Sequence, residues 1–174
     1  MSLEKNILAE LKKKGAGFVY FVDISQLPKE KNRGYPNAIL FGLVLTRPYL
    51  RHVANTPDYV QKLIESGSDF SDDEYHNTEL GTDALADYME EYLYKKGYSA
   101  FSQSDKSQLS EGSFDGMRKI TLLPHKTIAG MAGLGWIGKN NLLVTPQLGC
   151  GFCLGTILTD APLKGIANTP ILSM

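Results

Sequence analysis

Apolar residues follow two different spacings along the first part of this chain. Residues 3–14 carry leucine and isoleucine at helical spacing, and the lysines ahead of Gly15 predict the end of that helix. Residues 18–24 and 38–45 are continuous apolar runs, rich in β-branched and aromatic side chains. Such runs are typical of strands that are buried on both faces of a sheet.

The second part of the pattern predicts more helices and a polar connection. Thr56-Pro57-Asp58 has the composition of a helix start, and residues 71–74 (SDDE) have that of a capping box ahead of a longer helix that ends near Gly97. Residues 103–116 are strongly polar and predict a mobile loop or lid. The remaining expected elements are strands near 98–101, 142–145 and 154–159 and a short helix after Pro124.

We interpret this order of elements as the α/β (α+β) class, with a central mixed sheet covered by helices on both faces. The 174 residues fit one domain, expected over residues 1–163, with 164–174 as a tail or linker. A chain of this length needs neither a disulfide nor a metal to bury a core. It has no signal-peptide h-region and no apolar run of about 18 residues, so we expect a cytoplasmic protein without a membrane partner.

Charge and cysteine content narrow the classes of function. Lysine and arginine number 18 and aspartate and glutamate 19, a net charge of -1. Without a basic excess, we predict no nucleic-acid partner. Cys150 and Cys153 form a C-x-x-C pair that leads into an expected strand. We interpret them as small apolar side chains and expect no metal site, because zinc would need two further ligands.

Gly133, Gly135 and Gly138 match the pattern G-x-G-x-x-G. A dinucleotide-binding unit places a strand before this motif and a long helix after it. Here a helix is expected before the motif and little room for one follows, so the context argues against a nicotinamide cofactor. Two interpretations stay open: a turn that allows close packing, or a loop whose amides and Lys139 meet a polar or anionic part of a cofactor.

Two ring side chains flank this motif. His125 titrates near neutral pH in an ordinary environment, which suits a proton donor; a helix-capping or surface role is the alternative. Trp136 could lie against a planar macrocycle or fill the core.

The run HKTIAGMAGLGWIGKNNLLVT, followed by LGTILTDAPL, resembles the catalytic-domain signature of epoxyqueuosine reductases and their iron–sulfur relatives. The resemblance implies a nitroreductase-like fold that binds cobalamin in a crevice and reduces a small molecule or a modified nucleoside. FMN is the alternative cofactor. Carried over by position, the implied cofactor-binding residues are Ala132, Gly133, Leu134, Gly135, Trp136, Ile137, Gly138, Lys139, Thr159 and Asp160.

This chain departs from the family pattern in two places. The family's acidic proton donor would fall on Lys119, so Asp115, four positions away, and His125 are the candidate catalytic residues. The family also carries cysteine-rich motifs for two [4Fe–4S] clusters, and two cysteines cannot hold even one. Electrons would then come from a ferredoxin-type partner. The alternatives are an FMN-binding reductase of the nitroreductase type, or a non-catalytic domain that self-associates as a homodimer.

Overall fold

The computed structural model describes residues 2–112, 114–115 and 120–164, with the backbone alone for 114, 115 and 120. The helices are α1 (Leu3–Lys13), α2 (Lys29–Asn32), α3 (Arg47–Ala54), α4 (Tyr59–Glu65), α5 (Glu74–Lys95), α6 (Asp105–Ser110) and α7 (His125–Met131). The strands are β1 (Phe18–Asp23), β2 (Asn37–Val44), β3 (Ala100–Ser102), β4 (Phe114–Asp115), β5 (Ile120–Thr121), β6 (Trp136–Ile137), β7 (Leu143–Val144) and β8 (Phe152–Thr159).

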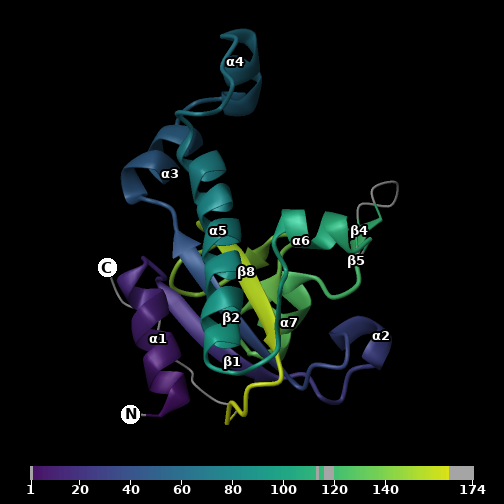
Figure 1. Cartoon of the computed structure of the whole chain (residues 1–174). Coiled ribbons are helices and arrows are strands. Elements are labelled where there is room, and N and C mark those ends of the chain that lie inside the picture. Colours follow the sequence, from purple (N-terminus) through teal and green to yellow (C-terminus); the bar gives the residue numbers. More distant parts are fainter. Residues whose placement is uncertain (1, 113, 116–119, 165–174) are drawn as a thin grey trace.

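Four strands form the main sheet in the order β1-β2-β8-β3, and every neighbouring pair is antiparallel (Figure 1). The α+β class is confirmed, but the expected mixed sheet is wrong for the described residues. A continuous apolar run reports that a strand is buried on both faces and does not report its direction. The nitroreductase-like arrangement stays a prediction.

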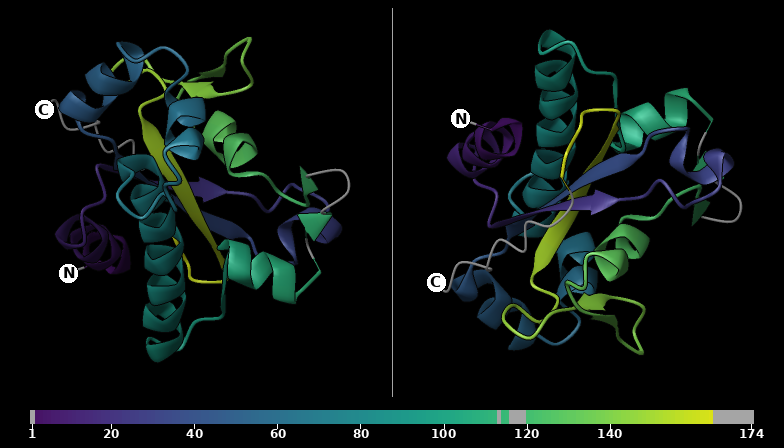
Figure 2. Two further views of the ribbon diagram at one scale, coloured as in Figure 1. Left: turned by 90° about the horizontal axis from the view of Figure 1, so that it is seen from above. Right: turned by 90° about the horizontal axis from the view of Figure 1, so that it is seen from below.

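Helices cover both faces of this sheet, as predicted (Figure 2). On one face, α1 and α5 pack on alternate residues of β1 and β2, including Val19, Phe21 and Ile39. On the other face, α7 packs with the intervening residues, including Phe18 and Leu40. Burying both sets of side chains supplies most of the stabilisation of such a layered fold.

One helix and two helix starts in this part of the chain differ from the expectation. α3 was not expected, and with α4 it forms an arm, residues 47–65, that projects beyond the end of α5 (Figure 1). The Thr56 hydroxyl donates to the His52 carbonyl at 2.8 Å. Thr56 therefore closes α3 and does not cap α4. The cap of α5 is Asp73, which accepts from the backbone N–H of His76.

The polar segment from residue 103 is ordered at its start, where α6 begins after the Ser104 cap. The capping hydroxyl accepts from the Ser107 amide at 3.3 Å. The expected tail from residue 165 onward lies outside the described residues. Within the described part of the chain, no helix combines the length and apolar character needed to cross a membrane.

Candidate functional site

The glycine motif forms a helix end and a hairpin. Gly133 ends α7 with a φ of +67°, and the N–H of Leu134 donates to the Ala129 carbonyl at 3.1 Å. This left-handed position favours glycine. β6 then pairs antiparallel with β7, and a Cβ at Gly135 would collide with the main chain of Val144. The motif is therefore a close-packing helix end followed by a hairpin, where a dinucleotide-binding unit would continue into a long helix.

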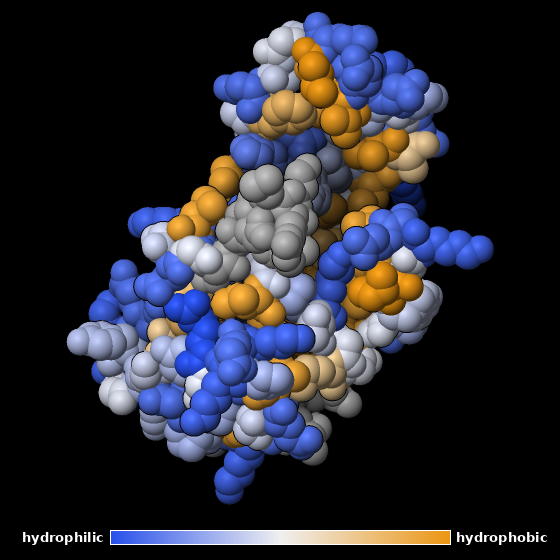
Figure 3. Space-filling view, turned by 90° about the vertical axis from the view of Figure 1, so that its right-hand side faces the viewer, coloured by the Kyte–Doolittle hydropathy of each residue, from blue (hydrophilic) through white to orange (hydrophobic). Residues whose placement is uncertain are grey.

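A cleft of about 250 Å³ lies between α5, α6, α7, the β6–β7 hairpin and the start of β8. Figure 3 shows hydrophobic surface gathered around a hollow between the arm and the body of the molecule. The cleft is lined by Tyr75, Glu79, Thr82, Asp83, Asp105, His125, Lys126, Leu142, Leu143, Cys150, Phe152, Cys153 and Leu154.

His125 is held at the cleft wall through one ring nitrogen. Its Nδ1 is in hydrogen-bond contact with Oγ1 of Thr156, a fully buried residue of β8. Burial lowers the pKa of His125 to about 4, although the nearby Asp105 carboxylate opposes that shift. A ring with this pKa is neutral at pH 7, and the role of His125 as a proton donor stays a prediction. The neighbouring Lys126 Nζ donates to the Asn141 carbonyl at 2.8 Å and ties α7 to the hairpin turn.

Carboxylates from two helices form the opposite wall. Burial raises the pKa of Asp83 to about 6, and the charges of Asp105, Asp87 and Glu79 raise it further. The Asp105 amide donates to Asp83 Oδ2 at 3.2 Å and works against this shift. Asp83 can therefore hold a proton close to neutral pH.

Tyr75 and the two cysteines complete the polar lining. The Tyr75 hydroxyl donates to Glu79 Oε1 at 3.3 Å, and burial together with the Glu79 charge raises its pKa to about 12. Burial, followed by the same charge, raises the pKa of the Cys153 thiol to about 12, so it stays protonated. Cys150 is exposed, and neither cysteine forms a disulfide. Among the described residues, no cluster of three or more His, Cys, Asp or Glu could hold a metal ion.

The structure brings only some of the expected site residues together. No residue of 132–139 lines the cleft. Leu142 and Leu143 of the β6–β7 hairpin do line it. Trp136 and Ile137 lie on the same hairpin and are exposed, with 56% and 48% of their surface accessible. The Asp115 side chain lies outside the described residues. Glu79, Asp83 and Asp105 were missed, because nothing in their local sequence distinguishes them from ordinary surface carboxylates.

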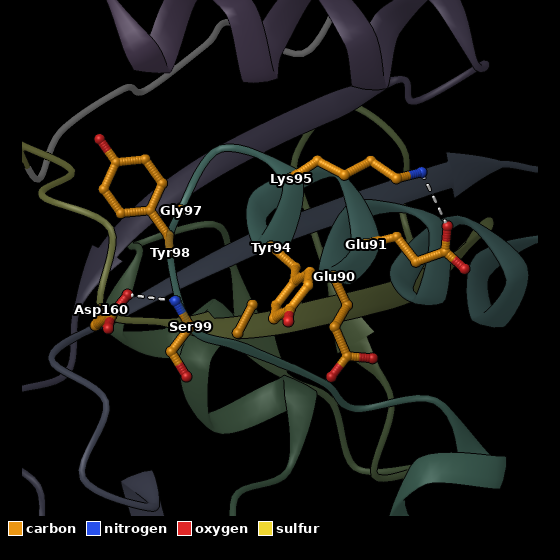
Figure 4. A pocket seen from close by; sticks show the side chains of 9 residues that line it. Glu90, Glu91, Tyr94, Lys95, Gly97, Tyr98, Ser99 and Asp160 are labelled. Carbon is orange, nitrogen blue, oxygen red and sulfur yellow. Dashed lines mark hydrogen bonds and ion pairs between the residues drawn. The ribbon is translucent and has the colours of Figure 1, made fainter.

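Thr159 and Asp160 lie at the far end of β8, about 23 Å from its start at the usual rise per residue. There the Thr159 hydroxyl donates to the Ser99 carbonyl and the Asp160 carboxylate accepts from the Ser99 amide, both at 2.8 Å. These bonds fasten the α5–β3 connection. Asp160 and Ser99 also line a surface groove of about 1060 Å³ beside Tyr94 (Figure 4). The groove is remote from His125, and its polar groups are largely engaged with one another.

Comparison with known proteins gives these features a context. No model of a known protein family matches the chain. The chain is 34% identical over 84 residues to epoxyqueuosine reductase of Pseudomonas aeruginosa, which is 44% of this chain and 23% of that protein. It is 46% identical over 37 residues to that of Listeria monocytogenes, 21% of this chain and 10% of that protein. The structure of epoxyqueuosine reductase from Streptococcus thermophilus superposes with a TM-score of 0.55 at 14% identity, covering 96% of this chain and 48% of that one.

The chain resembles part of an epoxyqueuosine reductase. It spans about half the length of that solved relative. Another resembling structure is an epoxyqueuosine reductase with an epoxyqueuosine-modified tRNA stem loop, with a TM-score of 0.52 and 14% identity over 95% of this chain and 47% of that one. This finding contradicts the expectation of no nucleic-acid partner. That expectation rested on the net charge, which averages over the chain and does not report where charges lie.

Proposed function

We propose that the chain is the ligand-binding part of a redox protein similar to epoxyqueuosine reductases, and that its substrate is a modified nucleoside in tRNA. One observation carries this proposal. The two runs that resemble the reductases supply much of one side of the cleft: His125 and Lys126 from α7, Leu142 and Leu143 from the hairpin, and Leu154 of β8. A cleft that combines apolar surface with a few convergent polar groups is the usual form of a ligand site.

The distribution of charge suits a base better than a phosphate inside the cleft. Glu79, Asp83 and Asp105 face the interior, so an anionic phosphate would be repelled there. Outside, Trp136 offers an exposed ring on the hairpin, and Lys139 is exposed on the same turn. Unpaired bases in RNA loops stack on aromatic side chains while cations contact the backbone. The nucleoside would enter the cleft and the phosphates would stay at its rim.

The residues present fit a large, partly apolar cofactor such as cobalamin at the rim. The cleft is smaller than the 300–1,000 Å³ typical of drug-sized ligand sites, so it would admit only part of such a molecule. Trp136, Ile137 and Leu142 expose about half of their surface on one hairpin and would hold the remainder. A bound corrinoid would supply the reducing centre, and the electrons would come from iron–sulfur clusters carried by another chain or segment.

Absorbance titration with cobalamin, run in parallel with FMN, tests the cofactor assignment. We expect the corrinoid bands to shift on binding, and Trp136→Ala to weaken this binding at least about tenfold, as the loss of one large buried contact does. Tyr94→Ala is the matched control, because Tyr94 is a largely exposed aromatic residue in the remote groove. Binding of FMN alone would replace cobalamin by a flavin. If neither cobalamin nor FMN binds, the hairpin has only a structural role. Light scattering would then show whether the protein forms a homodimer.

The nucleic-acid part is tested separately by fluorescence anisotropy with a labelled tRNA anticodon stem loop. We expect binding that weakens as salt increases, because phosphate contacts release counterions. Lys139→Ala should reduce the salt dependence, whereas Lys12→Ala, on α1 and far from the cleft, should not. If binding by both variants and by the original protein shows the same salt dependence, the hairpin is not part of the RNA-binding surface.

A further inference from the structure

Thr156 and His125 form a polar contact that joins α7 to the main sheet inside the cleft wall. Thr156 is fully buried in β8, and its Oγ1 contacts the Nδ1 of His125, 31 positions earlier at the start of α7. His125 lines the cleft and Thr156 does not. The hydroxyl thus lies behind the ring, and the second ring nitrogen, Nε2, is turned away from Thr156.

Hydrogen-bond accounting assigns the direction of this contact. A hydroxyl has one proton to donate, and a neutral imidazole carries one N–H. Within the described residues, the Thr156 hydroxyl has no other hydrogen-bond partner. If the imidazole donated from Nδ1, the buried hydroxyl proton would have no acceptor, which is unfavourable. If the hydroxyl donates to Nδ1, the buried hydroxyl proton has its acceptor, and the imidazole proton resides on Nε2, the nitrogen that is left for the cleft.

We propose that Thr156 is a positioning residue that holds His125 as the neutral tautomer protonated on Nε2, so that the cleft presents a fixed N–H donor to its ligand. The group recognised would be a hydrogen-bond acceptor, such as the oxygen of a carbonyl, hydroxyl, ether or epoxide. This inference rests on the proposed function only for the statement that the cleft is the ligand site.

The surroundings of the ring agree with a neutral imidazole. Burial lowers the pKa of His125 to about 4. The charged and titratable groups that line the same cleft are Tyr75, Glu79 and Asp83 on α5, Asp105 on α6, Lys126 on α7, and Cys150 and Cys153 at the start of β8. Of these, Asp105 favours the charged ring and does not overcome the cost of burial. A neutral N–H donor polarises an acceptor without transferring a proton, so a proton needed in the reaction would come from another group.

Side-chain nitrogen NMR of the ¹⁵N-labelled protein at pH 7 tests the proposal. The chain has three histidines, and His125→Gln assigns the relevant signals by their loss. We expect the Nε2–H tautomer in about tenfold excess, the ratio that one hydrogen bond of ordinary strength provides. Thr156→Val keeps the shape of the side chain and removes the hydroxyl, and should give a mixture of tautomers. Thr156→Ser retains the hydroxyl and should restore the excess.

Either of two results would overturn the inference: the Nδ1–H tautomer in the unmodified protein, or an unchanged tautomer ratio in a folded Thr156→Val variant. Backbone amide spectra establish that each variant is folded, and Thr156→Ala, which also lacks the hydroxyl, replaces the valine variant if that protein is unstable. The samples contain neither cofactor nor RNA. A failure of the cobalamin or stem-loop titrations therefore leaves this result intact, and a failure here leaves those titrations intact.

Discussion

Asp73 holds the arm to the long helix, and its replacement is expected to loosen the arm. Its Oδ2 accepts from the Tyr59 hydroxyl of α4 at 2.8 Å and from the Tyr49 hydroxyl of α3 at 3.0 Å. Its Oδ1 accepts from the His76 amide at 3.0 Å and caps α5. Neither α3 nor α4 contains a buried residue. These bonds therefore carry a large share of the attachment of the arm.

The magnitude follows from the bonds that are lost. Loss of a helix cap costs about 1 kcal/mol, and a hydrogen bond to a charged group contributes about 1.5–3 kcal/mol. Tyr49 and Tyr59 are only partly buried, so their freed hydroxyls can bind water, and about 1 kcal/mol each is the better value. We expect Asp73→Ala to cost about 3 kcal/mol, and Asp73→Asn, which keeps the cap, about 1–2 kcal/mol.

The same contacts give the arm a dependence on pH. Burial raises the pKa of Asp73, but the bonds from the His76 amide, Tyr59 and Tyr49 outweigh it, and the pKa lies below its usual value. A carboxyl whose folded-state pKa is lowered stabilises the protein above its unfolded pKa of about 3.9. That contribution is lost as the pH falls through the lower, folded value. The arm should therefore loosen below about pH 4 in the original protein and not in Asp73→Asn.

Hydrogen exchange followed by mass spectrometry measures this loosening, because an arm can open without global unfolding. At pH 7, peptides from residues 47–65 should exchange about ten- to thirtyfold faster in Asp73→Asn, which corresponds to about 1.4–2 kcal/mol. Asp72→Asn is the matched control, since Asp72 is the exposed neighbour and the charge change is the same. Equal exchange in the two variants would refute the assigned role of Asp73.

Two further predictions concern the cleft. Gly135→Ala should lower the free energy of unfolding by at least about 2 kcal/mol, because its Cβ would collide with the Val144 main chain. Gly130→Ala is the control and should be neutral or stabilising, because no atom lies within 4 Å of the added Cβ. Thermal unfolding compares the two variants. Asp83→Asn should stabilise by about 1 kcal/mol above pH 6, after allowance for solvent screening, and should not do so below pH 4. The reason is that burial raises the folded-state pKa of Asp83 to about 6, so ionisation costs stability as the pH rises. Urea titrations below pH 4 and above pH 6 measure the effect. The same stability difference between variant and original protein at both pH values would contradict the prediction.

The sequence predicted the elements that have a local signal. α1 shows helical spacing with lysines in its last turn, β1 and β2 are continuous apolar runs, and β8 was expected as a strand over 154–159. α3 was missed for a physical reason. Its cap, Thr46, accepts from the Tyr49 amide, but its residues are all at least partly exposed, so the chain carries no buried stripe to mark it. Strand direction had no local signal either, and the mixed sheet was wrong.

The candidate site shows the same division between local and long-range information. His125 could be selected because it stands next to an unusual glycine motif. Thr156 and Asp83 could not, because each acquires its role only when β8 and α5 are brought beside α7. Thr159 and Asp160 were carried over by position in sequence. In the fold, the length of β8 separates them from the cleft, and Ser99 occupies their polar groups.

The two sides of the cleft come from different parts of the chain, and this bears on what the cleft selects. One side is built largely by residues of the two runs quoted above, 125–145 and 154–163. The facing side, with Glu79, Asp83 and Asp105, comes from α5 and α6, which precede those runs in the chain. A ligand that spans the cleft must satisfy both. If the first side holds the redox cofactor, substrate choice lies with the acidic side, because a carboxylate that faces a ligand without a matching group costs more than apolar contacts gain.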